Sequence, residues 1–171
     1  MDLEIVENAL PPSLPQEIKD YSFTVRTYRT NLTSWNPNLV SSSGTILLYD
    51  LQDEMLEKVK AATLNVIGGQ YADNPWSVIY TLGSRMSWLP WHEDSNHLRS
   101  MTIYLNQEWS EDYAGYLLYK DEEHNVRAVL PTFNRGVVFT PPVSHCTVMP
   151  NLHAPLRESL QIFVNKKRDS A

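Results

Sequence analysis

Cysteine is almost absent from the sequence, because Cys146 is the only one and no internal disulfide can form. This usage is typical of a reducing compartment, so we expect a cytoplasmic protein. Long hydrophobic runs are also missing. No stretch approaches the roughly 18 apolar residues of a transmembrane helix, and the acidic first residues lack the positive region of a signal peptide. We therefore expect neither a membrane span nor a secretory leader.

Positive charge is scarce as well. The chain has 14 Lys and Arg against 20 Asp and Glu, which gives a net charge of -6. The overall field therefore repels a polyanion and disfavours nucleic acid as a partner. A small anionic ligand would need an arginine or lysine placed inside its own site.

What remains is the composition of an ordinary globular domain, with 171 residues of which 42% are hydrophobic and 20% charged. A chain of this length can bury a core without disulfides or a structural metal. It contains no repeat, no low-complexity tract and no long linker. We expect a single domain over residues 1–171, and these features leave its oligomeric state open.

One helix is strongly indicated near the middle of the N-terminal half. Asp50 can cap its start, and Gly68 and Gly69 follow its expected end. Apolar side chains recur between them at helical spacing, namely Leu51, Met55, Val59 and Ala62. A weaker helix is expected from Pro15 to about Tyr21, after a first strand over Leu3 to Val6. The polar segment Thr30 to Ser43 predicts a long loop, either a plain connection or a lid over a site.

After residue 75 the sequence changes to short β-rich runs separated by turn residues. The runs are Trp76 to Leu82, Arg85 to Trp91, Arg99 to Leu105, Gly115 to Lys120, Val126 to Leu130, Val137 to Thr140, Cys146 to Met149 and Arg157 to Asn165. Strands at this spacing predict an antiparallel sandwich or barrel. We expect a mainly β fold, a double-sheet jelly roll with N-terminal helical support.

The strongest local motif is His92-Glu93-Asp94, at the end of a predicted strand. Residues i and i+2 of a strand face the same side, so the imidazole and the Asp94 carboxylate converge while Glu93 turns away. Such a pair also arises readily by chance. Its interpretation depends on what the rest of the chain supplies.

Three further residues complete a pattern. His145 opens another predicted strand, and Arg157 and Ser159 lie two apart on the last one. Two imidazoles and one carboxylate, with open positions beside them, suit Fe(II) and a chelating ligand. The planar fork of Arg157 can hold a carboxylate through two parallel hydrogen bonds, and Ser159 can add a third donor. This pattern predicts a ligand with one chelating end and one distal carboxylate.

The order of these motifs resembles the Fe(II)/2-oxoglutarate-dependent dioxygenases, and within them the prolyl 4-hydroxylase-like group. The resemblance covers roughly residues 76 to 165. It rests on His92-x-Asp94, His145 and Arg157-x-Ser159, and on the intervening segments Arg99 to Asn106, Trp109, Ala114 to Tyr119 and Gly136 to Phe139. The resemblance implies a double-stranded β-helix, another term for this jelly roll.

The resemblance also implies a chemistry. Iron would be held by His92, Asp94 and His145, which would form the catalytic centre. 2-Oxoglutarate would chelate the iron through its keto acid end, and Arg157 would clamp its distal carboxylate. Dioxygen would be the other substrate, and ascorbate is a candidate reductant.

Two tyrosines match positions that often touch the co-substrate in this group. Tyr80 lies in the strand before the His-x-Asp motif, and Tyr104 lies just ahead of Leu105 and Asn106. A phenol can donate a hydrogen bond to a carboxylate oxygen. The alternative for both is an aromatic core residue on a strand.

Other histidines and the cysteine have simpler interpretations. His153 is a rival third ligand, but it lies in a Pro- and Asn-rich turn close to Arg157. We expect His97 and His124 in exposed loops. Cys146 follows His145 on a strand and should point to the opposite face, as a buried and inert thiol.

Four competing functions are also open to test. A zinc hydrolase would accept the same three ligands but would leave Arg157 and Ser159 without a purpose. The demethylase branch that acts on nucleic acid often has a second arginine where this chain has Phe163, and the halogenating branch lacks a carboxylate at the position of Asp94. A non-catalytic jelly-roll binding module is the fourth.

We therefore expect a dioxygenase that hydroxylates a C–H bond. A prolyl residue in a peptide or protein is the expected substrate, and a free amino acid or other small metabolite is the alternative. Fold alone does not separate the two, because function depends on the site and not on the fold.

Overall fold

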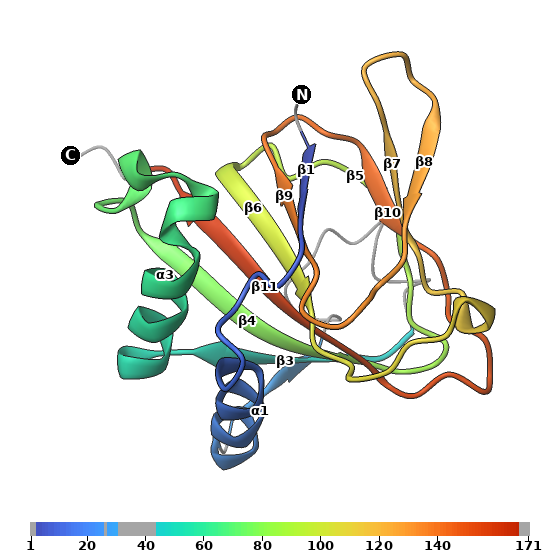
Figure 1. Cartoon of the computed structure of the whole chain (residues 1–171), viewed down its shortest axis with the longest axis horizontal. Helices are drawn as coiled ribbons and strands as arrows, with labels where there is room; N and C mark the ends of the chain where they lie inside the picture. Colours follow the sequence, from blue (N-terminus) through green and yellow to red (C-terminus); the bar gives the residue numbers. More distant parts are fainter. Residues whose placement is uncertain (1–2, 26, 31–43, 168–171) are drawn as a thin grey trace.

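The computed structural model describes residues 3–25, 27–30 and 44–167, which form two antiparallel sheets packed face to face (Figure 1). The larger sheet contains, in order, β1 (Leu3–Val6), β9 (Gly136–Phe139), β6 (His97–Tyr104), β11 (Arg157–Asn165), β4 (Trp76–Gly83), β3 (Ile46–Leu51) and β2 (Arg29–Thr30). The smaller sheet contains β5 (Leu89–His92), β10 (His145–Thr147), β7 (Leu117–Lys120) and β8 (Val126–Val129). This arrangement confirms the expected jelly roll.

Two α-helices, α1 (Leu14–Thr24) and α3 (Asp53–Ile67), cover the outer face of the larger sheet (Figure 1). Met55, Val59, Thr63 and Ile67 form the buried stripe of α3. This helix ends at Gly68, whose φ of 126° is one that side chains rarely adopt. Two single 3₁₀ turns, η2 (Gly69–Tyr71) and η3 (Glu111–Tyr113), complete the helical elements of the described ranges.

None of the helices found in residues 3–25, 27–30 and 44–167 is long and apolar enough to cross a membrane.

The sequence prediction was wrong at the start of α3. We expected Asp50 to cap the helix and Leu51 to open it, whereas both belong to strand β3 and the helix begins at Asp53. Leu51 is buried in either arrangement, so its apolar character cannot separate the two. Asp50 does not cap anything. Its carboxylate accepts two hydrogen bonds from Arg29 on β2, at 2.6 and 2.8 Å.

The remaining predicted elements are present with shifted ends. The weaker helix runs from Leu14 to Thr24, longer than expected, and the second predicted strand of the β-rich half is shortened to Leu89–His92 by a turn at Ser84. Of the predicted Thr30 to Ser43 loop, only Thr30 lies inside the described residues, where it ends β2.

Strand β11, red in Figure 1, lies at the centre of the larger sheet between β6 and β4. Its side chains alternate between two environments because successive residues of a strand point to opposite faces. Leu160, Ile162 and Val164 are completely buried beneath the helices. Arg157 and Ser159 point into the space between the two sheets, where burial is also nearly complete. The fold thereby directs polar side chains into an interior cavity.

Candidate active site

Two histidines from the smaller sheet face one another at the edge of that cavity. His92 is the last residue of β5 and His145 the first of β10, and the two are direct partners in the antiparallel register. Their ring centroids are 4.3 Å apart. Asp94 follows just beyond β5, with Oδ2 at 3.9 Å from His145 Nε2. One ligating atom from each residue lies within 4.8 Å of the others, so this group can hold a metal ion.

Both rings are oriented by the same local hydrogen bond. His92 Nδ1 lies 2.8 Å from the carbonyl oxygen of Pro90, and His145 Nδ1 lies 2.9 Å from that of Val143. A carbonyl oxygen only accepts, so each Nδ1 carries a proton, and in the neutral form of each ring Nε2 is the nitrogen that can ligate a metal. Oriented imidazoles of this kind are typical of metal-binding histidines.

Asp94 and His145 each have specific neighbours in the site. Ser100 donates a hydrogen bond to Asp94 Oδ2 at 2.9 Å. Burial lowers the pKa of His145 and the neighbouring His92 lowers it further. His145 also stacks on Phe139 with a centroid separation of 4.4 Å. The neutral imidazole that results is the form that ligates metals.

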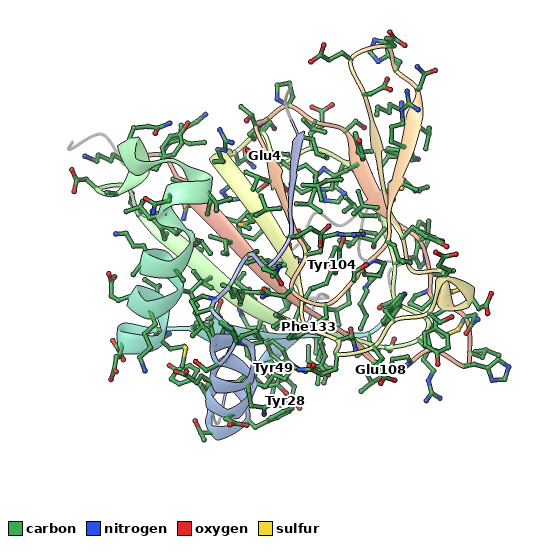
Figure 2. The ribbon with its side chains drawn as sticks, in the orientation of Figure 1. Glu4, Tyr28, Tyr49, Tyr104, Glu108 and Phe133 are labelled. Atoms are coloured by element: carbon green, nitrogen blue, oxygen red, sulfur yellow. The ribbon has the colours of Figure 1, made fainter. Side chains whose placement is uncertain are left out.

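The cavity beside this group has a volume of about 790 Å³ and lies between the sheets. His92, Asp94 and His145 line it, and so do Arg157 and Tyr104. Figure 2 shows Tyr104 in the interior, between the two layers of strands. The candidate metal ligands and the candidate anion ligands therefore line the same cavity.

Arg157 is a buried cation without a buried anion to match it. The residue opens β11 and is 7% exposed. Its guanidinium donates only long hydrogen bonds, to the carbonyl oxygens of Gly115 at 3.4 Å and Val148 at 3.3 Å and to Thr147 Oγ1 at 3.4 Å. Within the described part of the chain no carboxylate pairs with it, and burial lowers its pKa. A buried charge is normally paired, so this group fits an anionic ligand.

Tyr104 carries a second unsatisfied group in the same cavity. It lies opposite Ser159 in the register of β6 and β11. Its hydroxyl is buried and has no hydrogen-bond partner among the described residues. Burial raises the pKa of this phenol, so the hydroxyl stays protonated and can donate. An orphaned donor beside an uncompensated cation fits a carboxylate.

Comparisons with known proteins were made at two levels. No protein-family model and no curated protein matches the sequence. Solved structures match well. A prolyl-4-hydroxylase from Pseudomonas putida aligns with a TM-score of 0.75 at 15% identity, covering 96% of this chain and 93% of that one. A 2OG-Fe(II) oxygenase family oxidoreductase from Burkholderia pseudomallei gives a TM-score of 0.71 at 11% identity, over 96% and 85% of the two chains.

A third structure is a prolyl hydroxylase from Trichoplax adhaerens, in complex with a peptide fragment of the hypoxia inducible factor oxygen degradation domain. It aligns with a TM-score of 0.73 at 16% identity, over 96% of this chain and 83% of that one. This chain has the fold of the 2OG-Fe(II) oxygenases. The fold expected from the sequence resemblance is thus confirmed. The two sheets of this fold form the walls of the cavity.

Within this oxygenase fold, Ser159 lines the cavity, but its hydroxyl already has hydrogen-bond partners in the protein. Its hydroxyl is 2.6 Å from Thr81 Oγ1 and accepts a hydrogen bond from Gln161 Nε2 at 3.2 Å. Neither Thr81 nor Gln161 was found by sequence reasoning, because their proximity depends on which residues pair across neighbouring strands. Ser159 can still donate to a ligand if Thr81 donates to it.

Tyr80 corrects an expectation, because the oxygenase fold does not bring it to the cavity. It pairs with Leu160 on β11 and shares the face beneath the helices. Its hydroxyl donates to Glu158 Oε2 at 3.1 Å, and its ring lies 5.9 Å from that of Tyr49. Figure 2 shows Tyr49 beside α1, on the same side of the sheet. Neighbouring residues of a strand point to opposite faces, so the next residue, Thr81, lines the cavity and Tyr80 does not.

The other histidines and the cysteine mostly follow expectation. His153 and His124 are exposed, and neither belongs to the metal-binding group. Cys146 is buried on the face of β10 away from the cavity. His97 is the exception, because β6 begins two residues earlier than predicted and includes it. Its Nδ1 lies 2.8 Å from Asn165 Oδ1, and it is only partly exposed at the cavity wall.

Proposed function

We propose that this protein is an Fe(II)- and 2-oxoglutarate-dependent dioxygenase that hydroxylates a C–H bond. The observation that carries the proposal is the presence, in one cavity, of the His92, Asp94 and His145 group and of the uncompensated cation Arg157. A zinc hydrolase would use only the first of these features. A co-substrate that chelates a metal and ends in a second carboxylate uses both.

Each residue has a defined task in this proposal. His92 and His145 present Nε2 lone pairs and Asp94 presents a carboxylate oxygen, and these three atoms would hold Fe(II) while leaving positions open. Bound iron, together with 2-oxoglutarate and dioxygen, supplies the oxidation that converts the C–H bond to an alcohol. Arg157 would hold the distal carboxylate of 2-oxoglutarate through charge-assisted hydrogen bonds. Tyr104 would donate a further hydrogen bond to it.

The volume and the walls of the cavity also suit this reaction. A volume of about 790 Å³ falls within the roughly 300–1,000 Å³ of pockets that take drug-sized ligands. It therefore accommodates the co-substrate together with part of a substrate. On the side of the smaller sheet, Leu89 and Leu117 add apolar walls beside His92, His145 and Thr147. Such walls limit the access of bulk water to the reacting groups.

For the substrate we infer a prolyl residue in a peptide or protein. Two observations support this choice. The similar structures include prolyl hydroxylases, one of them in complex with a peptide fragment. In this chain Trp91 lines the cavity and is 42% exposed. The ammonium of Lys120 lies over its ring at 5.3 Å from the centroid, and the exposed remainder of the side chain can contact a peptide that reaches in from solvent. Partly exposed aromatic rings are common contact residues in binding sites.

The metal and co-substrate assignment is tested by spectroscopy without turnover. Fe(II) and then 2-oxoglutarate are added to the protein under anaerobic conditions, and the visible charge-transfer band of the chelate is recorded. A saturable band is expected with the unsubstituted chain. Absence of the band would overturn the assignment of Fe(II) and 2-oxoglutarate to this cavity.

The reaction and the substrate are tested by turnover in air, with and without ascorbate. Succinate release shows an active enzyme, and a chelate band without succinate would instead indicate a binding module. Proline-containing peptides are then compared with free proline and other free amino acids. Peptide-stimulated succinate release, with one oxygen atom gained by the peptide, is expected. Stimulation by free amino acids alone would transfer the proposal to a small-molecule hydroxylase.

A further inference from the structure

The strand that carries Arg157 continues beyond the end of its neighbour. In the register of β6 and β11, the last pair is Tyr104 with Ser159. Arg157 pairs with Gly83 of β4 on its other side, but β6 has already ended at this level. On the side of β6, the last backbone hydrogen bond runs from the N–H of Leu105 to the carbonyl oxygen of Glu158, at 3.0 Å. Beyond it, the N–H of Glu158 and the carbonyl oxygen of Leu156 have no strand partner.

The side chain of Asn106 occupies this gap. Its Nδ2 donates to the carbonyl oxygen of Leu156 at 2.8 Å, and its Oδ1 accepts from the N–H of Glu158 at 2.8 Å. These are the two backbone groups that flank Arg157 in the sequence. The side chain is buried, with the residue 5% exposed. A carboxamide carries the same donor and acceptor as a peptide group, so Asn106 extends the ladder by one position.

The clamp needs this support because Arg157 is weakly held by its own contacts. The three hydrogen bonds of its guanidinium span 3.3 to 3.4 Å, which is beyond the usual range for a strong bond. A bidentate bond to a carboxylate requires the fork to be in place to within about half an ångström. The backbone that positions the fork is fixed on one side by β4, and on the other by the N–H of Leu105 and by the two hydrogen bonds of Asn106.

We propose that Asn106 is a positioning residue for Arg157, and that it sets the affinity for the distal carboxylate of 2-oxoglutarate without touching that ligand. This inference rests on the proposed function of Arg157. It assigns Asn106 no role in binding iron, because its hydrogen bonds end on Leu156 and Glu158 and not on any member of the metal-binding group.

The chain offers a matched control in Asn134. This residue is 4% exposed and makes the same pair of bonds, donating to the carbonyl oxygen of Leu10 at 2.8 Å and accepting from its N–H at 2.9 Å. Its φ of 57° adds strain for most replacements. Asn134→Ala should therefore destabilise the fold at least as much as Asn106→Ala, while leaving the Arg157 backbone untouched.

The experiment measures three quantities for the full chain and for both variants. They are the unfolding midpoint, the affinity for Fe(II), and the affinity of the Fe(II)-loaded anaerobic protein for 2-oxoglutarate. Asn106→Ala should weaken 2-oxoglutarate binding by roughly tenfold to 100-fold, the range found when supporting partners are lost. Its Fe(II) affinity should stay within about twofold. Asn134→Ala should lower the midpoint and keep both affinities.

Two results would overturn the inference. One is an unchanged 2-oxoglutarate affinity in folded Asn106→Ala, and the other is an equal loss in both variants. If an alanine variant does not fold, Asn106→Asp and Asn134→Asp replace the pair, since each keeps the acceptor, removes the donor and adds the same charge. The same selective loss is expected. Failure of the unsubstituted protein to bind 2-oxoglutarate at all would instead refute the proposed function.

Discussion

His92 and His145 are cross-strand partners whose rings lie 4.3 Å apart, and each is fixed by a bond from Nδ1 to the carbonyl two residues before it. The pairing places two of the three candidate metal ligands on adjacent strands of the smaller sheet, and Asp94 follows just beyond the end of β5. Ligands on a rigid sheet are already in place before a metal arrives. Removing one of them should therefore remove affinity without loss of the fold.

The first prediction concerns metal binding. His92→Ala and Asp94→Ala should each lower Fe(II) affinity by more than about 100-fold, exceeding the usual effect of losing a supporting partner. Anaerobic titration followed by the chelate band measures this. His153→Ala serves as the control, because His153 is exposed and lies outside the group. Retention of the band in both ligand variants would show that the metal binds elsewhere.

The second prediction concerns the clamp. Arg157→Ala removes at least two hydrogen bonds to a charged group, each contributing about 1.5–3 kcal/mol. The affinity for 2-oxoglutarate should fall by about 100-fold or more, while Fe(II) binding persists. Arg157→Lys should lose most of the same affinity, because an ammonium cannot form the two parallel bonds of a guanidinium.

A surface arginine provides the control for that variant. Arg127 pairs with Asp121 on the exposed hairpin of β7 and β8 and does not line the cavity, so Arg127→Ala removes the same charge from outside the site. The affinity of Arg127→Ala for 2-oxoglutarate should match that of the unsubstituted chain. Equal losses in Arg157→Ala and Arg127→Ala would mean that net charge, and not a local clamp, governs binding of the anion.

The third prediction concerns the thiol of Cys146, which the structure buries on the face of β10 away from the cavity. Burial raises its pKa, so at a given pH the folded protein holds less of the reactive thiolate than a free cysteine does. Alkylation near pH 8 should be at least about tenfold slower in folded than in denatured protein. Fast alkylation of the folded chain, measured by mass spectrometry, would contradict this placement.

Strand geometry explains which parts of the site the sequence could predict. His92 with Asp94 and Arg157 with Ser159 are two residues apart, so a local period of two is enough to place each pair on one face. The structure brings these four residues to one cavity together with His145. The eight strands of the C-terminal part were also predicted, because turn residues separate them in the sequence.

The contacts that sequence reasoning missed depend on how the strands and the segments between them meet in space. Ser100 reaches Asp94, Thr147 reaches Arg157, and Asn106 reaches the backbone beside Arg157. None of these partners follows from a local pattern. Strand β3 was missed for another reason, since the apolar residue Leu51 satisfies the pattern of a strand end and of a helix start equally well.

The last prediction compares two tyrosines that were expected to act alike. Tyr80 donates a hydrogen bond to Glu158, which also pairs with Lys19 at 2.6 Å, whereas the Tyr104 hydroxyl finds no partner in the described chain. Tyr80→Phe should therefore lower the free energy of unfolding by about 1.5–3 kcal/mol, the cost of one hydrogen bond to a charged group. Tyr104→Phe removes an unsatisfied buried hydroxyl. It should leave stability unchanged or raise it by up to about 1 kcal/mol.

Affinity for 2-oxoglutarate should show the opposite order. Tyr104→Phe loses a donor to the distal carboxylate, and one charge-assisted hydrogen bond of about 1.5 kcal/mol corresponds to a roughly tenfold weaker binding. Tyr80→Phe should bind 2-oxoglutarate as tightly as the unsubstituted chain, because its side chain lies on the other face of the sheet. Denaturant unfolding and anaerobic titration of the two variants give all four values. If Tyr80→Phe weakened 2-oxoglutarate binding as much as Tyr104→Phe did, the claim that only Tyr104 contacts the co-substrate would be wrong.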